Sequence, residues 1–562
     1  MSSSPTFDTI CLSSLIKVFA DEEVGERPFL KGTALANETY SFQIAYRSDS
    51  LLKLIRTRVV SGLTARVSLR TVGLVTCEMP NYSDADQNVL RLAPGLYPDP
   101  LYPVTELDGL TAIPGQWRSL WVTVTLDGSV KPGTYPITIQ FTANNGEPLG
   151  EETFGLKVLT AELPEQKLLH TEWFHADCLA TYYGVDVFSE AHWTIVESFI
   201  ATAVKHGINM ILTPLFTPPL DTRIGGERPT TQLVDVTVER EGVYSFGFDR
   251  LKRWVEMCDR LGVQYFEFSH LFTQWGAKHA PKIVAQVDGS EQRIFGWDTD
   301  ATGVAYKDFL AQFLPQLVGF IKENGLEKRS YFHVSDEPTT PHLPTYESAS
   351  SWLSQFLGEF PVMDALSEYD FYERGLVKMP IPANNHIEPF LEHEVPGLWT
   401  YYCCAQHQDV SNRFICMPSA RNRVLALQLY KFNIAGFLHW GYNFYYSQYS
   451  RYPIDPYRVT DAGHAFPSGD PFVVYPGADG QPVESIRLEV FYEALQDLRA
   501  LEKLESLIGR ERVLALLEEG LERPITFSEY PHDASWLLEK RAQVNALIES
   551  ESLAQAEATP TA

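Results

Sequence analysis

Short apolar runs alternate with amphipathic stretches of helical period along most of the chain after Leu163-Pro164, and this alternation strongly restricts the possible folds. Buried strands separated by helices are typical of parallel βα units. Eight such units in succession predict a (β/α)8 barrel of the TIM type, which we assign to residues 166–506. The eight predicted strands are Leu168–His175, Asn209–Leu215, Gln264–Phe272, Ser330–Ser335, Val362–Leu366, Met379–Asn384, Leu398–Cys404 and Gly436–Tyr442.

The first 165 residues have a different pattern, in which apolar and polar residues alternate over Ser41–Tyr46, Leu120–Thr125 and Tyr135–Phe141. Alternation with period two and frequent Pro-Gly pairs predict an antiparallel β-sandwich over residues 1–165. Beyond the barrel we expect a short C-terminal helical extension over 507–549 and a disordered tail over 550–562. The predicted fold class is α/β plus β.

Charge and composition exclude several kinds of partner. The chain has 562 residues and carries 45 Lys and Arg against 72 Asp and Glu, a formal net charge of -27. Such a field repels polyanions, so no nucleic acid partner is expected. Since no run of about eighteen apolar residues occurs, no membrane partner is expected either. The oligomeric state stays open.

The N-terminal residues lack the basic and apolar regions of a signal peptide. The seven cysteines have no paired spacing, which is typical of reduced thiols. Together these features favour a cytoplasmic protein.

Motifs for metals and nucleotides do not occur in the sequence, which contains no HExxH, no paired Cys/His spacing, no GxGxxG ahead of a helix and no Walker loop. His170, Glu172 and His175 cluster near the first predicted strand, where packed histidines explain them better than a metal site does. We therefore expect no metal and no cofactor.

The sharpest chemical feature is the run Tyr331–Pro338, where an apolar strand ends in the adjacent carboxylates Asp336 and Glu337. The carboxyl ends of barrel strands face the active site, so this pair is placed for catalysis. On position alone, a structural alternative is equally consistent: Asp336 caps the following helix and Glu337 is solvated.

Adjacent carboxylates suit one scheme of glycoside hydrolysis in particular. Ordinary retaining and inverting enzymes use two carboxylates that flank the scissile bond, usually from separate strands. In a substrate-assisted scheme the acetamido oxygen of the sugar attacks its own anomeric carbon. One carboxylate then orients the amide and the other serves as acid and base.

Other predicted strand ends carry aromatic and hydrogen-bonding side chains, which are the groups that a pyranose ring requires. For each aromatic residue taken alone, core packing is the alternative. Several at successive strand ends favour a sugar pocket. The candidate substrate-binding residues are Tyr401, Trp440, Tyr442, His333, His175, Asp177, Arg223, His270, Trp275 and Asn384.

The run Ser335-Asp336-Glu337-Pro338 resembles the catalytic motif of glycoside hydrolase family 123. Similar matches extend over nearly the whole chain to about residue 505. In the sandwich they are Asn37-Glu38 with Ser41-Phe42-Gln43, and the segment from Pro114-Gly115-Gln116 through Tyr135. Further along the chain they are Trp399–Cys404, Phe437–Asn443, and Tyr475-Pro476-Gly477 ahead of Ser485–Leu488. The family consists of β-N-acetylgalactosaminidases that work by substrate-assisted retention.

By this resemblance, Asp336 would orient and stabilise the acetamido group and Glu337 would be the acid and base. A strand-end tyrosine of the family helps to hold the acetamido carbonyl, and Tyr401 is the candidate here, with Tyr402 as an alternative. The long loop that contains 221–228 departs from the family pattern, so the natural substrate is less defined than the reaction.

The sequence therefore predicts a retaining exo-glycosidase that releases terminal β-linked N-acetylgalactosamine (GalNAc) from an oligosaccharide or glycoside. Two alternatives remain open: a β-N-acetylhexosaminidase that prefers N-acetylglucosamine (GlcNAc), and a non-catalytic carbohydrate-binding barrel. GalNAc and GlcNAc differ at the C4 hydroxyl, for which His175, Asp177 and Arg223 are the polar candidates.

Overall fold

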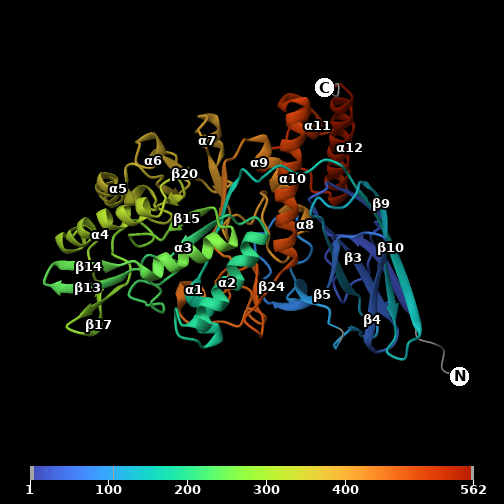
Figure 1. Ribbon diagram of the computed structural model, residues 1–562, viewed down its shortest axis with the longest axis horizontal. Coiled ribbons are helices and arrows are strands. Elements are labelled where there is room, and N and C mark those ends of the chain that lie inside the picture. Colours follow the sequence, from blue (N-terminus) through green and yellow to red (C-terminus); the bar gives the residue numbers. More distant parts are fainter. Residues whose placement is uncertain (1–5, 106, 559–562) are drawn as a thin grey trace. The chain divides into compact units, whose positions relative to one another are not determined.

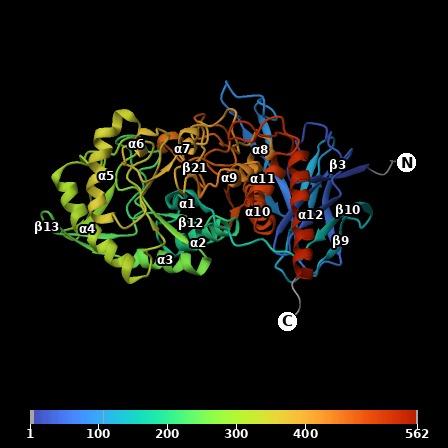
Figure 2. The same ribbon diagram turned by 90° about the horizontal axis from the view of Figure 1, so that it is seen from above.

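The computed structural model describes residues 6–105 and 107–558, and its contacts divide the chain into two units. The first unit comprises Met1–Gln166, Gln408–Phe432 and Val483–Ala562, and the second comprises Lys167–His407 and Asn433–Pro482. Figures 1 and 2 show the chain coloured along its sequence, with the first strands in blue and the last helices in red.

Two five-stranded sheets form the N-terminal part of the first unit. One has the order β1-β3-β8-β5-β6 and is antiparallel throughout. The other has the order β2-β10-β9-β4-β7, in which the β2–β10 pair is parallel and the other pairs are antiparallel. The strands are β1 (Phe7–Ser13), β2 (Lys31–Ala34), β3 (Thr39–Ser48), β4 (Leu52–Ser61), β5 (Arg66–Cys77), β6 (Gly95–Pro103), β7 (Leu110–Ala112), β8 (Arg118–Thr125), β9 (Gly133–Thr142) and β10 (Pro148–Val158).

The two sheets share one apolar core, because alternate residues of each strand point to the same face. Ile44 of β3 and Val122 of β8 are buried together with Ile139 of β9 in this core. The rings of Phe42 and Phe154, one from each sheet, stack with their centroids 4.3 Å apart. The predicted antiparallel sandwich is confirmed, with the parallel β2 strand as an addition.

Helices from the C-terminal part of the chain complete the first unit and are joined to its strands by buried ion pairs. Arg487 of α10 pairs with Asp99 of β6 at 2.9 Å, and Arg541 of α12 pairs with Glu38 at 2.7 Å. Ser485 begins α10 as its N-cap and accepts a hydrogen bond from the Leu488 amide. The helices are α8 (Ser419–Arg423), α9 (Leu425–Lys431), α10 (Ile486–Ile508), α11 (Arg510–Glu518) and α12 (Ala534–Ala558).

This grouping differs from the predicted division, which assigned residues 166–506 to the barrel and 507–549 to a separate extension. Residues 408–432 and 483–506 pack with the sandwich because α8 and α10 form buried ion pairs within that unit, such as Arg423 with Asp497. The predicted disordered tail over 550–562 is wrong as far as Ala558, since residues rich in Glu, Ala, Leu and Gln continue α12. Residues 559–562 lie outside the described residues.

All eight predicted parallel strands are present in the second unit, where each is two to four residues long. Six of them form a sheet in the order β18-β15-β12-β11-β22-β21, and the other two pair with each other. The strands are β11 (Leu169–Glu172), β12 (Met210–Thr213), β15 (Tyr265–Phe268), β18 (Ser330–Tyr331), β19 (Met363–Ala365), β20 (Met379–Ile381), β21 (Trp399–Tyr401) and β22 (Gly436–His439).

The observed pairing is a six-stranded half-barrel sheet plus a separate pair, and not the continuous eight-stranded ladder of the predicted barrel. Single parallel bridges join Phe332 to Val362 and Ala383 to Tyr401 at the two gaps. After β18 the Phe332 amide donates to the Pro361 carbonyl at 3.0 Å, and the Val334 amide donates to the Asp364 carboxylate at 3.0 Å in place of a backbone carbonyl. The strand end is thus used to build a polar network.

Helices surround these strands in Figures 1 and 2, and Ser189 caps α2 by accepting from the His192 amide. The helical segments are α1 (Ala176–Tyr183), α2 (Glu190–Lys205), α3 (Asp249–Leu261), α4 (Val304–Glu323), η1 (Thr340–His342), α5 (Leu343–Leu357), α6 (Asp370–Glu373), α7 (Glu388–Glu392) and η2 (Gln448–Ser450). Within residues 6–105 and 107–558, no helix has the length and apolar character needed to cross a membrane.

Two hairpins inserted after β12 and β15 were not predicted. They form a four-stranded sheet in the order β14-β13-β16-β17. Its strands are β13 (Asp235–Arg240), β14 (Val243–Gly247), β16 (Ile283–Val287) and β17 (Ser290–Phe295). The short strands β23 (Tyr475–Pro476) and β24 (Pro482–Val483) follow β22.

Candidate active site

A pocket of about 170 Å³ lies at the carboxyl ends of the parallel strands of the second unit. Its volume is below the range of about 300–1,000 Å³ that is usual for drug-sized ligands. It is lined by Trp173, Leu220, Asp221, Gln274, Trp275, Asp336, Glu337, Ala365, Tyr401, Cys403, Cys404, Leu438, Trp440, Gln448, Tyr449 and Phe466.

Asp336 and Glu337 line this pocket from the turn that follows β18. The Trp275 amide donates to the Asp336 carbonyl at 2.9 Å, and the Glu337 amide donates to the Ala365 carbonyl at 3.0 Å. Glu337 has a φ of +42°, a left-handed conformation that is unfavourable for a residue with a side chain. The alternative role for Asp336 as a helix cap is not realised, because Thr339 caps η1.

The electrostatics of the pair favour carboxyl groups that retain a proton. Burial and the charge of Glu337 raise the pKa of Asp336 well above its usual range. Burial also raises the pKa of Glu337, against the hydrogen bond that Tyr401 Oη donates to Glu337 Oε1 at 2.8 Å. No lysine, arginine or histidine among the described residues forms an ion pair with Glu337. Two close carboxyl groups that share a poorly solvated pocket therefore favour a state in which one of them is protonated.

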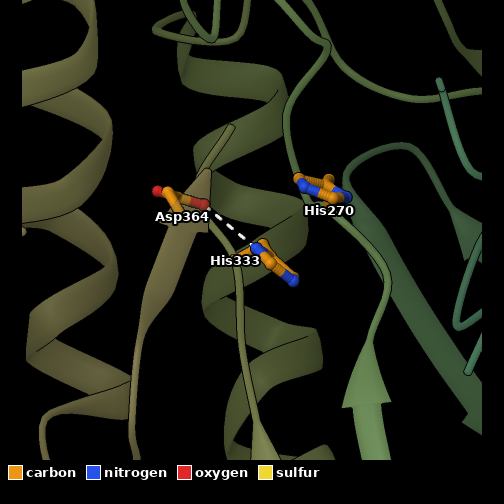
Figure 3. Close-up of side chains that lie close together, drawn as sticks. All are labelled: His270, His333 and Asp364. Atoms are coloured by element: carbon orange, nitrogen blue, oxygen red, sulfur yellow. Dashed lines mark hydrogen bonds and ion pairs between the residues drawn. The ribbon is translucent and has the colours of Figure 1, made fainter. Parts of the chain in front are cut away.

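A buried polar network lies next to this turn and centres on His333. His333 contacts Glu267 Oε1 through Nε2 at 2.6 Å. Its Nδ1 contacts Asp364 Oδ1 at 3.2 Å (Figure 3). Trp173 Nε1 also donates to Glu267 Oε1, at 2.7 Å, and Tyr346 Oη donates to Asp364 Oδ2. Burial would lower the pKa of His333, but the two carboxylates outweigh it and raise the pKa to about 10. The two carboxylates therefore favour the imidazolium form of His333.

His270 stacks on His333, with ring centroids 4.2 Å apart and planes 20° apart. Burial and the charge of His333 hold the pKa of His270 well below its usual range. His270, His333 and Asp364 present ligand-type atoms within 4.8 Å of one another (Figure 3). The stacked rings direct their in-plane lone pairs along nearly parallel planes, and both nitrogens of His333 already contact carboxylates. The contacts of His333 therefore favour ion pairs with Glu267 and Asp364 over a metal centre, whereas both ring nitrogens of His270 are buried without a hydrogen-bond partner among the described residues.

Three of the predicted substrate-binding residues contribute directly to the pocket. Tyr401, Trp275 and Trp440 line it. Tyr402 packs its ring against Phe437 and His439 instead, so Tyr401 is the tyrosine of this strand that faces the carboxylates. His333 lies beneath the pocket in the buried network.

The remaining candidates lie elsewhere. His175 and Asp177 are buried around Arg228, which donates to both Asp177 oxygens at 2.7 and 2.8 Å. Burial and then the charge of Arg228 lower the pKa of His175 to about 3. Tyr442 is a core residue that donates to the Phe199 carbonyl at 2.9 Å.

Arg223 is exposed, His270 is buried beside His333, and Asn384 is fully buried after β20. None of these three lines the pocket among the described residues. Arg228 holds the loop 220–228 in its conformation. Besides its ion pair with Asp177, its Nη1 donates to the Leu220 carbonyl at 3.1 Å.

Several residues of the site were not predicted. Asp221, Gln274 and Tyr449 come from loops with no strand or helix signal, so only the folded chain reveals them. Asp470 accepts from Trp440 Nε1 at 2.9 Å and lies far along the sequence from any predicted strand. Glu267 did carry a usable signal, because a carboxylate inside the apolar strand Gln264–Phe272 requires buried partners.

The His333 network predicts a specific dependence of stability on pH. A folded-state pKa of about 10 exceeds the reference value of about 6.5, so the stabilisation is complete below pH 6.5 and is lost as the pH rises to 10. We expect the free energy of unfolding of the wild type to fall across this window, by up to about 1.4 kcal/mol per pH unit. His333→Gln should be less stable and should lose this slope.

Thermal unfolding from pH 6 to pH 10 measures this effect. His386→Gln, at an exposed histidine, is the matched control and should keep the wild-type slope. Equal slopes for the wild type and His333→Gln would contradict an imidazolium at this position.

Comparison with known proteins places the chain in a family. The model for "Glycoside hydrolase 123, catalytic domain" matches residues 173–504. A family 123 glycoside hydrolase from Clostridium perfringens, studied for glycolipid glycan hydrolysis, is similar with a TM-score of 0.73 and 15% identity, over 98% of this chain and 99% of that one.

Two other solved structures are more remote. One is a β-glucuronidase from Parabacteroides merdae, with a TM-score of 0.31 and 11% identity over 88% of this chain and 52% of that one. The other is an endo-β-1,4-mannanase from Thermotoga petrophila, with a TM-score of 0.33 and 12% identity over 60% of this chain and 77% of that one. Neither bears on the function. No curated protein matches. Because the catalytic-domain model covers more than half of the chain and includes the turn that carries Asp336 and Glu337, this protein belongs to glycoside hydrolase family 123.

Proposed function

We propose that the protein is a retaining exo-β-N-acetylgalactosaminidase that uses the acetamido group of its substrate as the nucleophile. The observation that carries this proposal is the placement of Asp336 and Glu337, which are adjacent in the chain and line the same small pocket. Their raised pKa values and the absence of a cationic partner for Glu337 among the described residues favour acid catalysis over a purely structural pair.

In the first step the Glu337 carboxyl group donates its proton to the glycosidic oxygen, and the aglycone leaves as an alcohol. The acetamido oxygen attacks the anomeric carbon at the same time and forms a cyclic oxazolinium ion. With substrate bound, the proton of the carboxyl pair lies on Glu337. Asp336 is then a carboxylate, accepts a hydrogen bond from the amide N–H and stabilises the positive charge that develops on the ring. The network under the turn holds both carboxylates in position.

In the second step the Glu337 carboxylate removes a proton from water, and the water oxygen attacks the anomeric carbon from the side that the aglycone left. The oxazolinium ring opens, the acetamido group is restored and Glu337 regains its proton. Two inversions give net retention of configuration. Tyr401, which donates to Glu337 Oε1 in the free protein, would turn its hydroxyl to the acetamido oxygen when substrate binds.

The shape of the pocket supports an exo mode of action. A volume of about 170 Å³ suits one sugar residue, with the aglycone outside. Trp173, Trp275 and Trp440 supply the aromatic faces on which the apolar side of a pyranose packs. An oligosaccharide or glycoside with a terminal β-linked GalNAc is the proposed substrate, without a metal or cofactor.

We also propose that the eight parallel strands close into one barrel and that the protein is cytoplasmic. The single bridges at Phe332–Val362 and Ala383–Tyr401 support closure of the eight strands into one (β/α)8 barrel. The seven free cysteines support a cytoplasmic location.

Variants of the two carboxylates test the assigned roles. Glu337→Gln should lower kcat/KM on unactivated glycosides by about 100- to 10,000-fold, and by less on aryl glycosides whose leaving group needs little acid assistance. Asp336→Asn should lower both by about 100- to 1,000-fold, because the oxazolinium ion forms with either leaving group. Glu373→Gln, at an exposed carboxylate of α6, is the matched control.

The pH profile separates these roles further. Since burial raises the pKa of Glu337, wild-type activity should persist above the usual carboxyl range and fall as Glu337 loses its proton. Glu337→Gln should lack this alkaline limb. Equal losses of Glu337→Gln on unactivated and aryl glycosides would contradict the assignment of Glu337 as the acid.

The choice of sugar is tested with paired p-nitrophenyl glycosides of β-GalNAc, β-GlcNAc and β-galactose. We expect turnover to be highest with GalNAc and absent with galactose, which lacks the acetamido nucleophile. Faster turnover of GlcNAc would support the alternative hexosaminidase specificity. Turnover of galactose would contradict substrate assistance, and no turnover of any glycoside would favour a non-catalytic binding barrel.

A further inference from the structure

Four residues that line the pocket have a strained backbone. Asp221, Trp275, Glu337 and Tyr449 all line it and all have positive φ, at +37°, +60°, +42° and +60°. Each such conformation is unfavourable for a residue with a side chain, and the surrounding structure must hold it. Glu337 has a catalytic role in the proposed function, and Trp275 bonds to Asp336. The strain at Asp221 and Tyr449 has no such explanation.

Asp221 and Tyr449 join two loops that are distant in sequence. The Tyr449 amide donates to Asp221 Oδ2 at 2.9 Å, and Ser450 Oγ donates to the Asp221 carbonyl at 2.7 Å. The Arg223 amide donates to the Tyr449 carbonyl at 3.1 Å. Tyr449 also packs edge-on against Trp275, with ring centroids 5.9 Å apart. The loop 220–223 and the turn η2 are therefore clipped together beside the catalytic turn.

Only one oxygen of the Asp221 carboxylate takes part in these contacts between the loop 220–223 and η2. Oδ2 accepts from Tyr449, whereas no described residue donates to Oδ1. The residue is partly buried and lines the pocket. Burial raises the pKa of Asp221 to about 6, against the Tyr449 hydrogen bond and the charge of Arg228. The charge of Asp221 also contributes to the raised pKa of Asp336, so the two carboxyl groups interact electrostatically across the pocket.

We propose that Asp221 is a substrate-binding residue that accepts hydrogen bonds from ring hydroxyls of the terminal sugar through Oδ1, while Oδ2 keeps Tyr449 in place. The inference rests on the proposed function. Asp336 and Glu337 serve the anomeric carbon and the acetamido group, which leaves the hydroxyls at C3, C4 and C6 as donors. A carboxylate that is fixed at one oxygen and open at the other is an acceptor for such donors.

The test is binding of free GalNAc and its 3-deoxy, 4-deoxy and 6-deoxy analogues to the wild type, Asp221→Ala and Asp221→Asn, measured by titration calorimetry. A lost hydrogen bond to a charged acceptor should weaken the binding of GalNAc to Asp221→Ala by about 10- to 100-fold. The same substitution should have little effect on the analogue that lacks the bound hydroxyl. Asp221→Asn retains an acceptor for the Tyr449 amide and should show the same selective pattern with a smaller loss.

Ser450→Ala is the control for the clip, because it removes one loop contact and leaves the Asp221 carboxylate intact. It should bind GalNAc within a few-fold of the wild type. Equal losses for all four sugars in both Asp221 variants would overturn the proposal and leave Asp221 as a loop contact only. Because binding needs no turnover, this test stands even if the wild type hydrolyses none of the glycosides.

Discussion

Asp336 and Glu337 are consecutive residues, and the pocket that they share is too small and too poorly solvated for two negative charges to be favourable. The rest of the second unit is organised around this constraint. The left-handed backbone at Glu337 turns two adjacent side chains into the same pocket, which an extended strand would direct to opposite faces. The amides of Trp275 and Glu337 fix that turn against its neighbours.

The buried imidazolium of His333 offsets part of the negative charge that gathers here. It lies between Glu267 and Asp364. The Asp364 carboxylate also accepts a hydrogen bond from the amide of Val334, which is three residues before Glu337. Through these side chains the network links β15, β19 and the segment that follows β18. The strand ladder is interrupted between β18 and β19. One set of contacts thus follows the end of the strand and holds the carboxylates in place.

Sequence periodicity was sufficient to predict the strands and the motif, because period two, helical period and an apolar strand that ends in two carboxylates are all local signals. It located the eight parallel strands and the residues Asp336, Glu337, Tyr401, Trp275 and Trp440 of the pocket. It could not predict that α8 and α10 pack with the sandwich, because ion pairs such as Arg487 with Asp99 join residues far apart in the chain. For the same reason His175 and Asp177 looked like sugar ligands, although their partner Arg228 lies in a loop about fifty residues away. Asp221 and Tyr449 reach the pocket through backbone conformations that no sequence pattern signals.

In the proposed mechanism the substrate supplies its own nucleophile while Asp336 and Glu337 assist it. The most direct measurement is kcat/KM for p-nitrophenyl glycosides of GalNAc whose acetamido methyl carries zero, one, two or three fluorine atoms. Fluorine withdraws electrons from the amide oxygen, so kcat/KM should fall steeply and regularly along the series. A flat series would contradict substrate assistance and would point to a nucleophile supplied by the protein.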